Sequence, residues 1–188
     1  MLDAAAALLG ICRERTYDGG EPAMKLETAA HAGKPSAWEI EYQLDSGCEV
    51  LSTRSLLAEA YRRSAAGGER AEDLAASIQY NLARGGVAAM AVRAAEERGG
   101  IPRVALSGGV AYNRAIRETI RTEIRTAGLE FIMNKGYPLG DGCISFGQVV
   151  YGGGAWRSES PPRIHRAVAG QASLFFAEHR RPLVRNCF

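Results

Sequence analysis

A strand–helix–strand–helix pattern in the second half of the chain constrains the fold more than any other feature. The apolar run Val104–Leu106 leads into a glycine turn, and a helix is expected over Tyr112–Thr126, with Gly128 as its C-terminal stop. A second short apolar strand is expected at Leu129–Met133. Two strands joined by a crossover helix lie parallel in one sheet and connect right-handedly. The sequence therefore predicts an α/β fold with a small parallel sheet.

One glycine turn follows the first of these strands, and another precedes the helix that comes after the second strand. Gly108-Gly109 comes directly after Val104–Leu106, and Asp141-Gly142 precedes an apolar helix expected over Ile144–Tyr151. Helix N-termini carry unpaired N–H groups that can hold an anion, and ligands usually bind at the carboxyl ends of such strands. The pattern is typical of a nucleotide or acyl-phosphate site, although many strand–glycine–helix turns bind nothing. Asp141 itself is explained as a helix N-cap at least as readily as a metal ligand.

The first half of the chain is predicted to be mostly helical, with one β-hairpin. The long helical region is expected to bend at Gly85-Gly86, and Gly152–Gly154 is expected to end the last apolar helix. Beyond it, Arg163–Glu178 has the pattern of one amphipathic helix within a tail. The remaining predicted elements are helices over Leu2–Cys12, Pro22–Ala30, Ser52–Ala65 and Ala71–Arg98, and hairpin strands over Trp38–Leu44 and Cys48–Leu51.

Length, net charge and cysteine spacing limit the classes of protein to which this chain can belong. A length of 188 residues suits one domain or one lobe of a larger protein. The formal net charge of +2 gives no reason to expect nucleic-acid binding. The four cysteines lack C-x-x-C spacing, and the sequence shows neither a signal peptide nor an apolar stretch long enough to cross a membrane. We therefore expect a reduced, cytoplasmic protein without a zinc knuckle.

Four segments, taken in order, resemble the HypF-type carbamoyltransferases of nickel–iron hydrogenase maturation. They are Leu2-Asp3-Ala4 with Leu8-Leu9-Gly10, Tyr17–Glu27, Leu106–Val110 with Asn113, and Asp141-Gly142 leading to Gly147-Gln148. The resemblance is to the second lobe of that family's C-terminal domain, which is similar to the Kae1/TsaD threonylcarbamoyl-transfer proteins. It implies an actin/Hsp70/sugar-kinase type of fold. Residues 1–154 would form this lobe, and residues 155–188 would be a tail of unknown role.

The resemblance also implies a site and a reaction. Asp141 looks like the family's metal-binding aspartate, the divalent metal being Fe or Zn in a complete domain. The nucleotide is of the ATP/AMP type, a carbamoyl-adenylate, whose carbamoyl group passes to a cysteine of the partner protein HypE. The residues that match the nucleotide-binding positions are Asp3, Gly19, Gly20, Glu21, Gly108, Gly109 and Asn113.

The sequence departs from this family in ways that leave its activity open. The family has a preceding lobe with a metal-binding histidine pair, and further upstream modules, of which this sequence shows no trace. Gly140 stands where asparagine is usual, and Cys143 where glycine is usual. We therefore expect weak nucleotide binding and no turnover by this chain alone, with the first lobe, the upstream modules and HypE as expected partners.

Three alternatives remain at this stage. The chain could be a non-catalytic binding or assembly lobe that docks to a partner, or to itself, through an exposed apolar face. It could be a relative of the tRNA-modifying proteins, although Glu21–Met24 and Ile144–Gln148 are more similar to HypF and the weak charge offers no tRNA surface. It could also be a relic without activity.

Overall fold

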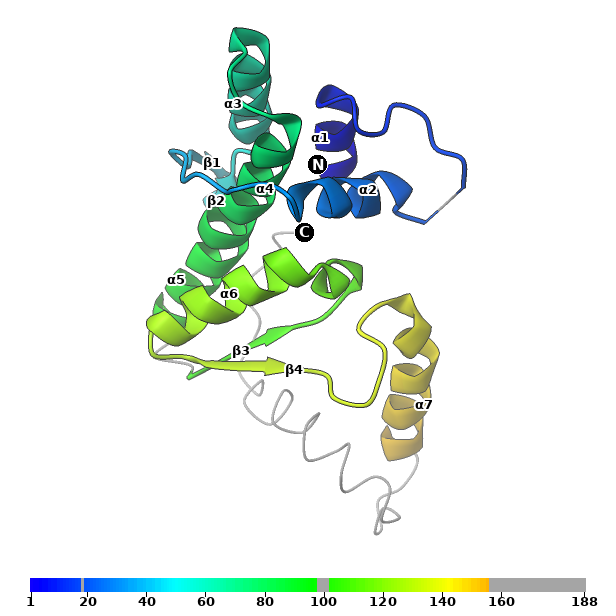
Figure 1. Cartoon of the computed structure of the whole chain (residues 1–188). Coiled ribbons are helices and arrows are strands. Elements are labelled where there is room, and N and C mark those ends of the chain that lie inside the picture. Colours follow the sequence, from blue (N-terminus) through cyan, green and yellow to red (C-terminus); the bar gives the residue numbers. More distant parts are fainter. Residues whose placement is uncertain (18, 98–101, 156–188) are drawn as a thin grey trace. The chain divides into compact units, whose positions relative to one another are not determined.

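The computed structural model describes residues 1–17, 19–97 and 102–155, and the chain divides into two compact units, Met1–Gly140 and Asp141–Phe188. The first unit holds the helical layers, a hairpin and the parallel strands, and the second holds the last helix (Figure 1). In chain order the elements are α1 (Leu2–Leu8), α2 (Glu21–Ala30), β1 (Tyr42–Asp45), β2 (Cys48–Leu51), α3 (Thr53–Ala66), α4 (Ala71–Asn81), the π-helical η1 (Leu82–Ala88), α5 (Ala89–Glu97), β3 (Arg103–Leu106), the short helix η2 (Gly109–Tyr112), α6 (Arg114–Thr126), β4 (Glu130–Met133), η3 (Asp141–Cys143) and α7 (Ile144–Ala155).

Helices α1, α2, α3 and α4 share one hydrophobic core. Alanines on α1, α3 and α4 let the helices approach closely, and larger side chains fill the space between them. The helix predicted over residues 2–12 stops at Leu8, because Gly10 turns left-handed at φ +73° and the N–H groups of Ile11 and Cys12 both donate to the Ala6 carbonyl. The fully or nearly fully buried members of this core are Ala5, Ala6, Leu26, Leu56, Ala60, Leu74, Ala75 and Ile78.

The hairpin is confirmed but is shorter than predicted. Its strands pair antiparallel across Ser46 and Gly47, which both have positive φ, 51° and 83°, as a tight two-residue hairpin turn requires. The strand predicted from Trp38 begins only at Tyr42. The reason is that the Trp38 N–H donates to Asn81 Oδ1 on α4 instead of to a neighbouring strand.

The long helical region is continuous from α4 through α5, and its glycine pair lies in the π-helical segment η1. An added Cβ at Gly85 would lie 2.5 Å from Cγ1 of Ile40, and one at Gly86 would lie 2.6 Å from Cδ2 of Leu51. The two glycines thus let the hairpin region approach the helix backbone, and Tyr42 Oη donates to the Gly85 carbonyl at 2.6 Å. At Gly85-Gly86, where a bend was expected, the helix makes a π-helical turn.

Strands β3 and β4 run parallel, as predicted, with α6 packed over one face (Figure 1). Ile116, Ile120 and Ile124 recur every four residues on α6 and are at most 2% exposed, as is typical of an amphipathic helix on a sheet. The helix begins two residues later than predicted, at Arg114, because Asn113 caps it and residues 109–112 form η2. The chain is therefore a mixed α/β fold, as expected.

The second unit is described only by η3 and α7. The prediction that Gly152–Gly154 ends the helix is wrong, since α7 continues to Ala155. Glycine costs a helix only about 1 kcal/mol relative to alanine, and proline does not interrupt this stretch. The tail with its predicted helix at Arg163–Glu178 lies outside the described residues. Among those described, no helix is both long and apolar enough to span a membrane.

Candidate functional site

The second glycine turn, Gly108-Gly109, leaves the carboxyl end of β3. Gly108 has φ +94°, a conformation that favours glycine, and its N–H donates to the Leu139 carbonyl at 2.7 Å. No atom lies within 4 Å of a Cβ built on Gly109, so the space above its backbone is open. As the first residues of a helical turn, Gly109 and Val110 have no intrahelical acceptor for their N–H groups. The turn therefore has backbone N–H groups that no helical hydrogen bond uses.

Tyr112 joins this turn to the loop after β4. Its hydroxyl oxygen accepts the N–H of Leu139 at 2.9 Å and the N–H of Gly140 at 3.4 Å. Ser107 Oγ adds a hydrogen bond to the Leu139 carbonyl at 3.2 Å. Sequence reasoning missed Tyr112, because a tyrosine in a glycine-rich turn carries no local signal for a partner almost thirty residues away.

Asn113 is placed at the same turn, but its side chain is used internally. It is 7% exposed, and its Oδ1 accepts the N–H of Ile116 at 3.0 Å, which makes it the N-cap of α6. Its Nδ2 donates to Oε1 of Gln79 at 2.6 Å. The amide therefore fixes where α6 begins and how the turn enters it.

The first glycine turn, Gly19-Gly20, precedes α2. Both residues have positive φ, 101° and 83°, and Gly20 is the N-cap of the helix. Neither has an atom within 4 Å of an added Cβ. Both glycine turns thus share an exposed backbone at the start of a helix.

The buried carboxylate of Glu21 fixes the conformation of the chain around the first glycine turn. Glu21 is 1% exposed, and its carboxylate accepts the N–H groups of Thr16 at 2.7 Å and Tyr17 at 3.2 Å, the Thr16 hydroxyl at 2.9 Å, and an ion pair from Lys25 Nζ at 2.6 Å. The bond from Lys25 lowers the pKa of Glu21 most, burial opposes it, and the bonds from Thr16 and Tyr17 lower it further, to about 2. The same ion pair raises the pKa of Lys25.

Hydrogen bonds from polar side chains connect α2, α4 and α6, and two of these helices, α2 and α6, follow the glycine turns. Gln79, 1% exposed on α4, donates to the Leu26 carbonyl at 3.3 Å and accepts from Asn113. Glu27 on α2 accepts the N–H of Arg114, the first residue of α6, at 2.8 Å. A carboxylate at a helix N-terminus is favoured by the helix dipole. The helices that follow the two glycine turns are therefore joined directly by Glu27 and, through α4, by Gln79. Sequence reasoning missed both residues.

The two acidic candidates are exposed. Asp3 lies in the first turn of α1, and Asp141 opens η3 in the second unit. Within the described part of the chain, no three His, Cys, Asp or Glu side chains gather closely enough to hold a metal ion. Since divalent metals in proteins need several ligands, the described residues do not fit a complete metal site.

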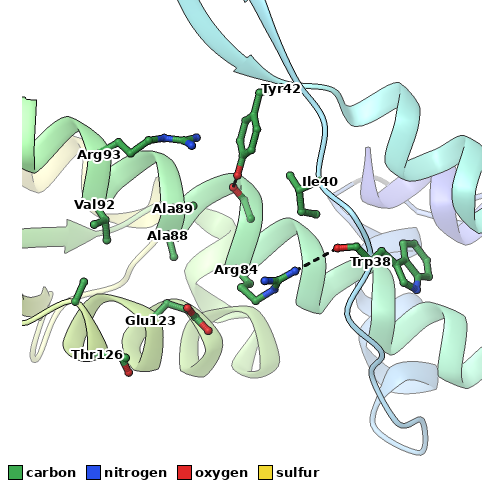
Figure 2. A pocket seen from close by; sticks show the side chains of 12 residues that line it. Trp38, Ile40, Tyr42, Arg84, Ala88, Ala89, Val92, Arg93, Glu123 and Thr126 are labelled. Atoms are coloured by element: carbon green, nitrogen blue, oxygen red, sulfur yellow. Dashed lines mark hydrogen bonds between the residues drawn. The ribbon is translucent and has the colours of Figure 1, made fainter.

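A hollow of about 570 Å³ lies away from both turns, against the C-terminal end of α6 (Figure 2). Arg84 Nη2 donates to the Trp38 carbonyl at 3.2 Å across it, and the Arg93 guanidinium stacks 4.3 Å from the Tyr42 ring. Thr126 marks the helix end that lines it. None of the residues predicted from the sequence for nucleotide or metal lines this hollow.

Comparisons with known proteins agree on one family. Residues 1–148 match the family model described as carbamoyltransferase, Kae1-like domain, second subdomain. The chain is 36% identical over 150 residues to the probable carbamoyltransferase HypF of Methanocaldococcus jannaschii, with 80% of the chain and 19% of the relative covered. It is 30% identical over 151 residues to the carbamoyltransferase HypF of Rhizobium leguminosarum bv. viciae, with the same coverage.

Solved structures are similar over the same region. The crystal structure of T. kodakarensis HypF shares 39% identity at a TM-score of 0.69, over 81% of this chain and 19% of that one. A full-length HypF in a phosphate- and nucleotide-bound form shares 28% identity at a TM-score of 0.72, over 84% of this chain and 20% of that one. The chain thus spans about a fifth of the length of these relatives.

Proposed function

The chain belongs to the HypF carbamoyltransferase family, as its Kae1-like second subdomain, and from this premise we propose that it supplies one side of a nucleotide site for carbamoyl transfer. The observation that carries the proposal is the pair of glycine turns, whose backbones are open at the starts of α2 and η2. One relative was solved in a phosphate- and nucleotide-bound form, which supports a nucleotide as the ligand. The nucleotide is of the ATP/AMP type, and the reacting species is carbamoyl-adenylate.

The predicted site residues have four different proposed roles. Gly109 would bind phosphate through its backbone N–H, and Gly108, whose own N–H donates to the Leu139 carbonyl, would shape the turn. Asp3, Gly19 and Gly20 would contact the sugar and base region. Glu21 and Asn113, which are at most 7% exposed and fully engaged, would act by holding the two turns in shape. Asp141 would contribute one ligand to a metal whose other ligands come from elsewhere. No step of the reaction is assigned to that metal.

The proposed chemistry is a group transfer to sulfur. The thiol sulfur of a HypE cysteine attacks the carbamoyl carbon, the bond from that carbon to the AMP phosphate oxygen breaks, and the thiol proton passes to solvent. Negative charge then develops on the departing phosphate. Backbone N–H groups fixed in the second glycine turn stabilise that charge without reorganising, as preorganised donors do.

AMP binding tests this proposal. We would titrate AMP into the chain alone and into the chain mixed with the preceding subdomain of a HypF relative, expecting weak binding alone and at least about tenfold tighter binding in the mixture. Gly109→Ala, which meets no atom within 4 Å, should fold normally and weaken binding at least about fivefold by blocking the approach to the backbone. Gly147→Ala, equally open, is the matched control. Equal AMP affinity in Gly109→Ala and wild type would contradict the proposal.

A second candidate, a binding or assembly lobe, is favoured by the open face of the β3–β4 sheet. Ile132 is 38% exposed on the face opposite α6, and β3 pairs only with β4 among the described residues. Parallel sheets are normally covered on both faces. If this face is an interface between copies, light scattering should show a dimer for wild type and a monomer for Ile132→Glu. A monomer at every concentration would exclude self-association.

A further inference from the structure

We infer that Tyr112 is a positioning residue for the second glycine turn, and that its role depends on glycine at position 140. The inference rests on the proposed function, because it concerns the same phosphate-binding turn. It adds a residue that neither the motif nor the family match assigns. The physical basis is a set of hydrogen bonds that meet at one dipeptide, Leu139-Gly140.

The loop after β4 has no regular structure of its own, so its end must be fixed by contacts. The Leu139 carbonyl accepts both the Gly108 N–H and Ser107 Oγ, while the Leu139 and Gly140 N–H groups donate to Tyr112 Oη. The Tyr112 hydroxyl thus makes two of the hydrogen bonds that join the two loops. We call these two bonds the Tyr112 bridge.

Gly140 leaves the space that the tyrosine ring occupies. A Cβ at this position would lie 3.1 Å from Tyr112 Cε2 and 3.5 Å from the Gly109 Cα, tighter than ordinary contact for the ring. The backbone of Gly140 does not have a positive φ, so alanine suits its conformation and only the crowding opposes it. A side chain here would crowd the Tyr112 ring and strain its hydrogen bonds to the loop, while its approach to Gly109 would be an ordinary contact.

The bridge also explains why an exposed tyrosine is held in place. Tyr112 is 56% exposed, so burial alone fixes it little, and its two hydrogen bonds supply the constraint. Since Gly109 and Tyr112 are the two ends of the single helical turn η2, a ring tied to Leu139-Gly140 also fixes the direction of the Gly109 N–H. Loss of the hydroxyl should therefore reach the phosphate-binding backbone.

The first test is Tyr112→Phe in the full chain, with Tyr61→Phe, an exposed tyrosine on α3, as the control. The Leu139 and Gly140 amides should exchange with solvent about tenfold faster, while the Ile120 amide in α6 is unchanged. AMP affinity, measured where both variants are fully folded, should fall about threefold. Unchanged protection of both amides would overturn the bridge, and lost protection with unchanged AMP affinity would overturn its positioning role.

The second test is a double-mutant cycle. Gly140→Ala should lower Tm by about 3 °C when Tyr112 is present and leave it unchanged or raised in a Tyr112→Ala background. Equal Tm shifts in both backgrounds would overturn the dependence on Gly140. If wild-type chain binds no AMP even with the preceding subdomain, the proposed function fails, and the amide protection and this cycle still decide whether the bridge exists.

Discussion

The two glycine turns expose similar backbones but are held in different ways. The first is held by an ionised side chain from its own helix, since Glu21 binds Thr16, Tyr17 and Lys25, all within five residues. The second is held by neutral hydrogen bonds from a distant loop, through Leu139 and Tyr112. The first turn should therefore respond to pH and the second should not.

This difference also separates local from long-range folding. The first turn can form as soon as α2 forms, because its partners are neighbours in sequence. The second needs β3 and β4 to pair in register before the Leu139 loop can reach it.

Removal of the carboxylate from the first turn should have the largest effect. Glu21→Ala leaves two backbone N–H groups and the Lys25 ammonium without their acceptor, so we expect Tm to fall by about 10 °C. Differential scanning calorimetry measures this shift. Glu14→Ala, an exposed carboxylate beside the same turn, should change Tm by no more than about 2 °C. A similar loss in both variants would contradict the account of Glu21.

Loss of the N-cap of α6, the helix that follows the second glycine turn, should have the second-largest effect on stability. Asn113→Ala removes the N-cap of α6 and leaves Gln79 without its donor, and we expect a loss of about 2 kcal/mol in the free energy of unfolding. Asn113→Ser keeps the capping oxygen and should lose less. Urea denaturation of both variants measures the difference, and equal losses would show that the cap is not what Asn113 contributes.

The pH dependence separates the two turns without truncating either. The pKa of Glu21 is lowered from 4.5 to about 2 in the folded chain, so its contribution is complete above pH 4.5 and is lost as the pH falls toward 2. The urea midpoint should therefore fall more steeply in this window for wild type than for Glu21→Gln. Asn113→Ala should keep the wild-type slope. An equal slope in wild type and Glu21→Gln would show that Glu21 is not linked to folding.

The smallest effect on stability is expected at Asp3. This exposed carboxylate in the first turn of α1 contributes only a weak helix-dipole interaction, so Asp3→Asn should change the unfolding free energy by less than about 0.5 kcal/mol. If Asp3 contacts the nucleotide sugar, AMP affinity should still fall about threefold or more. Unchanged affinity in this variant would remove Asp3 from the proposed site.

The elements of the fold were largely predictable because their signals are local. The glycine turn before it and Gly128 after it located α6, and the crossover pattern predicted the parallel pair β3–β4. The end of α7 was predicted too early, because glycine was given too much weight as a helix terminator. The error at the start of the hairpin has a long-range cause. The Trp38 N–H donates to Asn81 on α4, so the hairpin strand begins only at Tyr42.

The candidate site was predictable only in part for the same reason. The glycines of both turns are visible in the sequence, since an open backbone requires them. What Glu21 and Asn113 do was not visible, because burial of a polar side chain depends on the whole fold. Tyr112, Gln79 and Glu27 had no signal, since their partners lie 27, 34 and 87 residues away.

A titration with AMP followed by backbone amide shifts tests the central claim most directly, using the chain together with the preceding subdomain of a HypF relative. The account predicts that the largest shifts appear at Gly19, Gly20, Gly108 and Gly109, with smaller shifts at Leu139. Shifts confined to the hollow around Arg84, or no shifts at either glycine turn while the chain remains folded, would contradict it.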